Sequence, residues 1–305
     1  MYVCFLDATK AFDRVDYTVL FQKLSSRNVP GYIVKFLWNW YSKHCGQAFN
    51  RIALTFAMVY VRQGGMLSPF LFALYIDQLS IHLQAVNVGC RLGNLIVNHF
   101  LFADDIDIFA PSAKRLQELL DVCSNFADTH RVVFNVSKSQ CLIVHSKGDT
   151  FTQPVFRLCS FALPYTDNYE YLGHFINSRL TDDADIMRQT RSLYATANGV
   201  VRKFSSSSLC TKLLLFKAFC TPIYGCSLWC SMFQYSLNKL RVAYNDAFRF
   251  LLNEPRWCSA SRLFVLHNIP SFSAVIRKSI YSLRIVIMFL CRLFYCPIYA
   301  CYSHF

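Results

Sequence analysis

An apolar stretch at residues 98–109, interrupted by two adjacent aspartates, most constrains how this chain can fold. Apolar residues flank Asp104 and Asp105 on both sides, and each flank is long enough for one short strand. The sequence therefore predicts two strands joined by a tight turn, with both carboxylates at that turn.

Two adjacent carboxylates repel each other, and the apolar flanks lower the dielectric around them. A divalent cation offsets that repulsion, and Mg²⁺ favours carboxylate oxygens, completing its shell with water and substrate phosphates. Asp104 and Asp105 therefore favour a metal site. A plain hairpin turn is the alternative, because Asp is common in turns.

Asp7 offers a third carboxylate, because it ends the apolar run 2–6, which we expect to be a buried strand. Two ions about 3.5–4 Å apart can activate an attacking 3′-hydroxyl and stabilise a leaving pyrophosphate. If Asp7 meets Asp104 and Asp105 in the fold, the three acids predict a site for phosphoryl transfer.

The order of expected elements predicts an α+β fold. It contains a split βαβ pattern on an antiparallel sheet with helices on one face. After the first strand, Asp16 is expected to cap a helix, and a second helix passes through residues 33–40. The remaining expectations are a strand pair at 50–62, a helix from Pro69, a helix after Ser112, a strand at 140–145 and a hairpin at 165–178.

From about residue 185 the pattern is helical to the end, and the charge changes with it. Residues 1–185 hold 16 Lys and Arg against 16 Asp and Glu, whereas residues 186–305 hold 15 against Asp246 and Glu254. A basic helical region suits a phosphate backbone as partner. Basic helices that only keep an apolar domain soluble are the alternative.

The chain has 14 cysteines, but none in a Cys-x-x-Cys pair or with zinc-finger spacing. We expect reduced, buried cysteines, no disulfide framework, and an intracellular protein, nuclear or cytoplasmic. No uncharged apolar run reaches the length of a membrane span, so we expect no membrane partner.

Five short motifs, in order, resemble those of reverse transcriptases encoded by non-LTR (LINE-type) retrotransposons. The motifs are FLDATKAFD at 5–13, RQGGMLSP at 62–69, FADD at 102–105, FNVSKS at 134–139 and YEYLG at 169–173. LFKAFCTPIYGCSLW at 215–229 resembles the thumb segment of the LINE-type enzymes and favours that branch over group II introns.

The resemblance implies an RNA-directed DNA polymerase that extends a DNA primer on an RNA template with dNTPs and two Mg²⁺ ions, or Mn²⁺ in their place. Asp7, Asp104 and Asp105 would be the catalytic acids and metal ligands. Phe12 would exclude a ribose 2′-hydroxyl, although a core Phe after a strand is the alternative.

The resemblance implies further nucleotide contacts at Gln63, Gly64 and Lys138. Gly64 would permit close approach of the backbone, with a simple turn as the alternative. Lys138 would lie near the triphosphate, with a solvated surface lysine as the alternative.

The resemblance also implies a primer grip and a thumb that holds the nucleic-acid backbone. The residues expected in these roles are Tyr171, Leu172 and Gly173 in the primer grip, and Arg188, Arg191, Arg202 and Lys203 on thumb helices. The expected domains are a palm at 1–180, a helical thumb at 181–255 and a helical extension at 256–305. The family's fingers would precede Met1, so we expect them to be missing. A catalytically inactive remnant that only binds nucleic acid is the alternative function.

Overall fold

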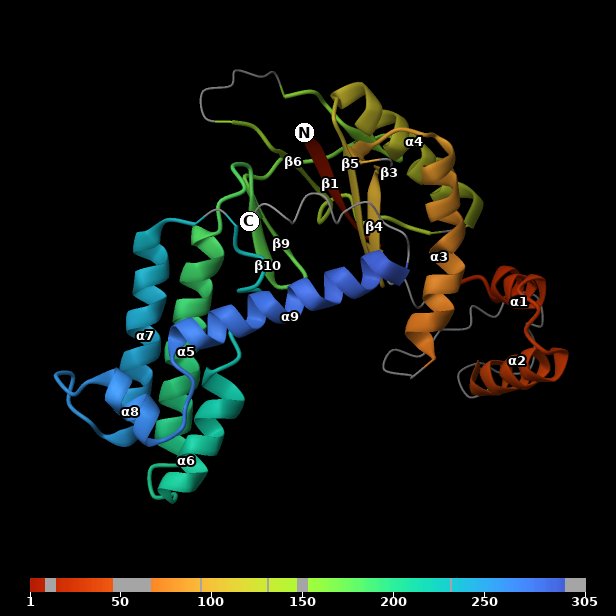
Figure 1. The fold of residues 1–305 in the computed structure, drawn as a ribbon. Coiled ribbons are helices and arrows are strands. Elements are labelled where there is room, and N and C mark those ends of the chain that lie inside the picture. The colour runs from red at the N-terminus through yellow and green to blue at the C-terminus, as the bar shows by residue number, and fades with distance from the viewer. Residues whose placement is uncertain are drawn as a thin grey trace. The chain divides into compact units, whose positions relative to one another are not determined.

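The computed structural model describes residues 1–8, 15–45, 67–93, 95–130, 132–146, 153–230 and 232–293 (Figure 1). The chain forms two compact units, residues 1–167 and 168–305. The division lies earlier than the expected palm boundary at residue 180, because the hairpin expected at 165–178 packs on the helix that follows it.

The first unit is built on a four-stranded antiparallel sheet. Its strands are β1 (Tyr2–Asp7), β4 (His99–Phe102), β5 (Asp105–Ala110) and β6 (Gln140–Ile143), in the order β4-β5-β1-β6. Because β1 lies between β5 and β6, the first strand of the chain is enclosed by two later ones. The expected antiparallel sheet and mixed α and β content are confirmed.

Four helices accompany this sheet. They are α1 (Tyr17–Ser26), α2 (Gly31–Cys45), α3 (Ser68–Ala85) and α4 (Ala113–His130). The Asp16 side chain accepts a hydrogen bond from Thr18 N–H at 2.9 Å, so the expected N-cap of α1 is confirmed. Helices α3 and α4 pack on the sheet, and α1 packs on α3 (Figure 1).

Alternation along the strands places one set of side chains in the core between sheet and helices. Leu6 and Ile106 are opposite each other in the β1–β5 ladder, and both are fully buried against residues of α3 and α4. Asp7 and Asp105 are the next pair along this ladder, so they point to the other face of the sheet.

The described residues also form three short hairpins, and two of them lie in the first unit. These are β2 (Cys90–Leu92) with β3 (Leu95–Val97), and β7 (Arg157–Leu158) with β8 (Phe161–Ala162). The third, β9 (Asn168–Tyr171) with β10 (His174–Asn177), opens the second unit.

Beyond β10 the second unit is helical in its described residues, as expected. Its helices are α5 (Asp183–Lys203), α6 (Leu209–Leu215), the π-helical turn η2 (Phe216–Cys220), α7 (Gln234–Leu252), α8 (Ala260–Leu266) and α9 (Phe272–Leu293). Helices α5 and α7 pack along each other, around a core in which the rings of Phe248 and Phe264 stack at 4.8 Å. Because Phe264 lies beyond residue 255, the expected C-terminal extension shares this core with α5 and α7 at least as far as Ile276.

No helix among the described residues is long and apolar enough to cross a membrane. The ten cysteines for which the structure gives a state are all unpaired, and Cys4, Cys123, Cys141, Cys220 and Cys226 are buried. The strand pair expected at 50–62 lies outside the described residues.

Candidate active site

The turn between β4 and β5 carries the two adjacent aspartates. Phe102 and Asp105 close the ladder, which leaves Ala103 and Asp104 as the two turn residues. Ala103 has a φ of 53°, the sign that hairpin turns need at their first position. A positive φ costs an alanine about 1–2 kcal/mol, so the turn that presents Asp104 is held under backbone strain.

Asp7 lies directly opposite Asp105 in the β1–β5 ladder. Residues paired in this way project from the same face of an antiparallel sheet, with Cβ atoms about 4.5–5.5 Å apart. The ladder therefore brings together two acids that are far apart in the sequence, at the strand ends beside Asp104. This is the juxtaposition that the sequence predicts for a phosphoryl-transfer site.

The electrostatics of the turn follow from this crowding. Burial, then the charges of Asp104 and Asp7, raises the pKa of Asp105 above its usual value. Among the described residues, no side chain or backbone N–H donates a hydrogen bond to the carboxylates of Asp7, Asp104 or Asp105. Within the part of the chain that the structure describes, these acids thus lack the hydrogen-bond donors that ordinarily offset a cluster of negative charge.

A loop before β6 is fixed to the same end of β1 by hydrogen bonds to the backbone of Asp7. The N–H of Asn135 donates to the Asp7 carbonyl at 2.8 Å, and the Asp7 N–H donates to Ser139 Oγ at 3.1 Å. Ser139 is fully buried, and its hydroxyl donates to the Asn135 carbonyl at 2.8 Å. Lys138 lies between these anchors and is exposed. The loop thus places Lys138 near the end of β1 that carries Asp7.

The chemistry of the ligand set fits a hard divalent cation, since it consists of carboxylate oxygens. In their present rotamers, however, the described residues include no group of three His, Cys, Asp or Glu side chains close enough to hold one ion. Rotation about the side-chain bonds of Asp7, Asp104 and Asp105 would be required to bring all three carboxylates onto a shared ion.

Asp107 shares the face of Asp105 and Asp7 but lies two pairs further along the ladder, opposite Phe5 and Phe100. It is only 5% exposed, whereas Asp104 is exposed and Asp105 is half-buried. Asp107 is therefore less accessible to a ligand than the other two acids of this hairpin.

The structure differs in what it describes of the other residues expected to contact the nucleotide or the primer. Phe12, Gln63 and Gly64 lie outside the described residues. Tyr171, Leu172 and Gly173 form the end of the β9–β10 hairpin in the second unit.

The four basic residues expected on a thumb helix all lie on α5. Arg191, Arg202 and Lys203 are exposed. Arg188 differs, because its guanidinium donates to the Asp185 carboxylate and to the Gly173 carbonyl. Arg188 thus binds groups of the protein itself, whereas the sequence analysis expected it to contact a phosphate of the nucleic acid.

Sequence reasoning also missed the residues that anchor these elements. Ser139 and Asn135 fall within the fourth motif, but only the lysine beside them attracted attention. Asp185 lies near the expected boundary at residue 180 and was given no role, but it is fully buried and hydrogen-bonded. An acid on the apolar side of a helix, at the spacing of the buried Ile186 and Gln189, is the signal that could have identified it.

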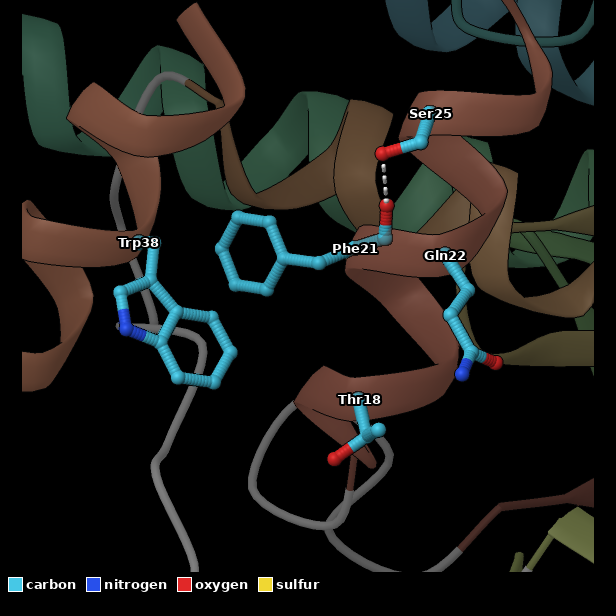
Figure 2. A pocket seen from close by; sticks show the side chains of 5 residues that line it. All are labelled: Thr18, Phe21, Gln22, Ser25 and Trp38. Carbon is cyan, nitrogen blue, oxygen red and sulfur yellow. Dashed lines mark hydrogen bonds between the residues drawn. The ribbon is translucent and has the colours of Figure 1, made fainter. Parts of the chain in front are cut away.

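A cavity of about 390 Å³ lies apart from these acids, and is lined by Thr18, Phe21, Gln22 and Ser25 of α1 and by Trp38 of α2 (Figure 2). The rings of Phe21 and Trp38 meet edge to face at 5.1 Å, and the Ser25 hydroxyl donates to the Phe21 carbonyl at 3.0 Å. The five lining residues include no charged side chain, so this cavity is a poor candidate for phosphoryl transfer.

Comparison with known proteins adds a second line of evidence. Residues 1–176 match the family described as "Reverse transcriptase (RNA-dependent DNA polymerase)". The chain is similar to the Pol polyprotein of the type-2 retrotransposable element R2DM of Drosophila melanogaster, with 31% identity over 185 residues, which is 56% of this chain and 17% of that protein. It is also similar to the RNA-directed DNA polymerase from the mobile element jockey of Drosophila funebris, with 25% identity over 278 residues, 85% of this chain and 29% of that protein.

The Pol polyprotein of the type-1 element R2 of Popillia japonica is 33% identical over 122 residues, which cover 38% of this chain and 17% of that protein. The chain thus spans less than a third of the length of these curated relatives. A solved structure of telomerase from Candida albicans, in complex with a fragment of telomeric RNA, aligns over 89% of this chain and 50% of its own. Its identity of 9% and TM-score of 0.42 are too low to establish a shared fold.

Proposed function

The chain belongs to the reverse transcriptase (RNA-dependent DNA polymerase) family, with relatives among non-LTR retrotransposons, and we propose that it extends a DNA primer on an RNA template with dNTPs. The observation that carries this proposal is the ladder position of Asp7 opposite Asp105, next to Asp104 in the turn. Nucleotidyl transfer needs carboxylates from two separate segments at one place, and the pairing of Asp7 with Asp105 supports this role for the three residues.

Asp7, Asp104 and Asp105 would hold two Mg²⁺ ions, or Mn²⁺ in their place. When bound, such ions lower the pKa of a primer 3′-hydroxyl and neutralise the charge of the leaving pyrophosphate. The chain itself contributes the geometry: the β1–β5 ladder fixes the spacing of two acids, and the strained turn fixes the third. Because no described residue donates to these carboxylates, their oxygens remain available as ligands.

Lys138 supports the same role, because its loop is hydrogen-bonded to the backbone of Asp7. An exposed ammonium at this position would attract the triphosphate of an incoming nucleotide and offset charge on pyrophosphate. Phe12, Gln63 and Gly64 would complete the nucleotide site, as the motifs around them suggest.

The first unit would then be the palm, and the second unit would carry the primer grip at Tyr171, Leu172 and Gly173 followed by the thumb. Arg191, Arg202 and Lys203 would contact phosphates of the primer–template duplex, because they are exposed on α5. Such contacts are independent of base sequence and weaken as salt rises.

Primer extension on an RNA template, with Mg²⁺ and dNTPs, tests this function. Asp104→Asn is expected to lower the rate at least about a hundredfold, because loss of a ligand charge removes several kcal/mol of transition-state stabilisation. Asp128→Asn is the matched control, since Asp128 is an exposed acid on α4 in the same unit. Extension by Asp104→Asn at the wild-type rate would contradict the proposal.

Nucleic-acid binding without catalysis is a second candidate function. The observation in its favour is that the three acids do not converge on one ion position among the described residues. Salt-sensitive binding of a primer–template duplex by the wild-type chain, with no extension in Mg²⁺ or Mn²⁺, would favour this second function over the first.

A further inference from the structure

The β9–β10 hairpin ends in a turn whose backbone is unfavourable for its sequence. Leu172 has a φ of 46° and Gly173 a φ of 73°, so both turn residues are left-handed. A type I′ turn needs this pair of signs and usually takes Asn-Gly, because leucine in this region costs about 1–2 kcal/mol. Strain of this kind persists only where the surrounding structure fixes it.

Side chains from elsewhere in the second unit hold both carbonyls of this turn. The Tyr224 hydroxyl donates to the Leu172 carbonyl at 2.7 Å. The Arg188 guanidinium donates to the Gly173 carbonyl. The turn is thus fixed by donors from α5 and from the segment after η2.

Asp185 orients the guanidinium of Arg188. Its Oδ1 accepts from Arg188 Nε at 3.0 Å and from Nη2 at 2.7 Å, which fixes the plane of the guanidinium. Its Oδ2 accepts from Trp229 Nε1 at 2.9 Å. The Asp185 side chain is 0% exposed, so removal of its charge would leave the arginine without its fixed partner.

The surroundings of Asp185 are closely packed. Gly225 has a φ of 76°, and a Cβ there would lie 3.2 Å from His174 Nδ1 and 3.6 Å from Asp185 Oδ2. His174 Nδ1 itself lies 3.1 Å from Asp185 Oδ2, but is not aligned for a hydrogen bond. Asp182 adds another tie, since its Oδ2 accepts from Cys230 N–H at 2.8 Å.

We propose that Asp185 is a positioning residue for the Leu172–Gly173 turn, acting through Arg188 on the Gly173 carbonyl. This inference rests on the proposed function, in which that turn grips the primer. The turn exposes 37% of Leu172, whereas Asp185 and Trp229 behind it are buried. A rigid turn of this kind holds a primer end in one place, which shortens the search for a reactive geometry.

Hydrogen exchange measured on the full chain tests the positioning role without any need for catalysis. Asp185→Asn is expected to speed exchange of the amides of residues 170–176 by about tenfold or more, because a charge-assisted contact to the turn is lost. If Asp185→Asn does not fold, Arg188→Gln decides the matter, since it leaves the Trp229 contact to Asp185 intact. Unchanged exchange at 170–176 in the folded variant would overturn the proposal.

Asp246→Asn is the matched control for these variants. Asp246 accepts from Arg249 three residues later, and Arg249 in turn donates to the Cys258 carbonyl at 2.8 Å. This pair on α7 repeats the arrangement of Asp185 and Arg188 in the same unit but holds a different carbonyl. Exchange at 170–176 is expected to stay unchanged in Asp246→Asn, and an equal rise there would overturn the proposal by showing a general loss of stability.

Primer extension then separates this inference from the proposed function. Where the wild type extends primers, Asp185→Asn and Arg188→Gln are expected to raise KM for primer–template about tenfold and leave KM for dNTP within about twofold. Equal KM values for primer–template in variant and wild type would overturn the positioning role in catalysis. A wild type that does not extend primers would contradict the proposed function instead, and hydrogen exchange would still decide whether Asp185 holds the turn.

Discussion

The two hairpin turns that the proposed function uses are built in opposite ways. The turn at Ala103 and Asp104 presents carboxylates that receive no hydrogen bond from the described residues. At the turn of Leu172 and Gly173 the backbone is exposed to a ligand, and both of its carbonyls accept hydrogen bonds from the side chains of Tyr224 and Arg188. Both turns take a positive φ at a residue other than glycine.

The difference follows from what each turn would bind. A turn that takes cations needs negative charge that the protein has not already neutralised, and it bears the resulting repulsion. A turn that grips a primer needs a fixed shape, so its strain is held by neighbours such as Arg188 and Tyr224. Each turn is therefore expected to respond differently when its surroundings change.

Gly225→Ala should have the largest effect on stability, because it disturbs the packing behind the second turn. Its positive φ and the contact at 3.2 Å with His174 Nδ1 predict a loss of about 1–2 kcal/mol in the free energy of unfolding. Urea denaturation of the whole chain measures it. Gly199→Ala is the control: Gly199 lies in α5 with nothing within 4 Å of an added Cβ, and alanine there should stabilise by about 0.5–1 kcal/mol. An unchanged free energy of unfolding in Gly225→Ala would contradict the tight packing behind the Leu172–Gly173 turn.

The first turn should respond to pH. The raised pKa of Asp105 means that the folded chain binds this proton more tightly than the unfolded chain, whose ordinary value is 3.8. Between these two pKa values the folded state carries more protons, so stability falls as pH rises through that window. Above the pKa of the folded state, the full loss of stability that comes from ionised Asp105 remains.

Thermal unfolding of the wild type and of Asp105→Asn over pH 3.5 to 7 measures this effect. The Tm of Asp105→Asn is expected to exceed that of the wild type by an amount that grows with pH. Asp128→Asn, on an exposed part of α4, should show no such growth. A Tm difference independent of pH would show that Asp104 and Asp7 do not act on Asp105 in the folded chain.

Ala103→Gly should have the smallest effect. Glycine removes the strain of a φ of 53°, but it also increases the freedom of the unfolded chain. These terms nearly cancel, so the free energy of unfolding is expected to rise by no more than about 1 kcal/mol in urea denaturation. Ala127→Gly, inside α4, should instead lower the free energy of unfolding by about 1 kcal/mol. A large loss in Ala103→Gly would mean that the methyl group of Ala103 makes a packing contact that the strain argument omits.

The sequence predicts much of the first turn, because local signals determine it. Two apolar flanks fix the hairpin, and the short run before Asp7 fixes β1. Periodicity does not give the order β4-β5-β1-β6, because pairing between distant strands depends on how whole faces pack. The five ordered motifs, and not periodicity, indicated that Asp7 belongs with Asp104 and Asp105.

The second turn could not be derived in the same way. Its anchors, Arg188, Tyr224 and Trp229, come from separate segments of the helical region and meet only in the folded chain. An arginine on a basic helix suggests a phosphate contact from sequence alone, since its acceptors, Asp185 and the Gly173 carbonyl, are visible only in three dimensions. The packing of the β9–β10 hairpin on α5, which puts both in the second compact unit, is likewise visible only in three dimensions.

Binding of Mn²⁺ to the whole chain tests most directly whether the distant acids form one site, because it needs neither primer nor catalysis. Asp7→Asn is expected to weaken Mn²⁺ binding by about tenfold or more, as much as Asp105→Asn does, since the two residues are opposite each other in one ladder. Asp7→Asn that binds Mn²⁺ like the wild type, while Asp105→Asn does not, would contradict the shared site on which the proposed polymerase function depends.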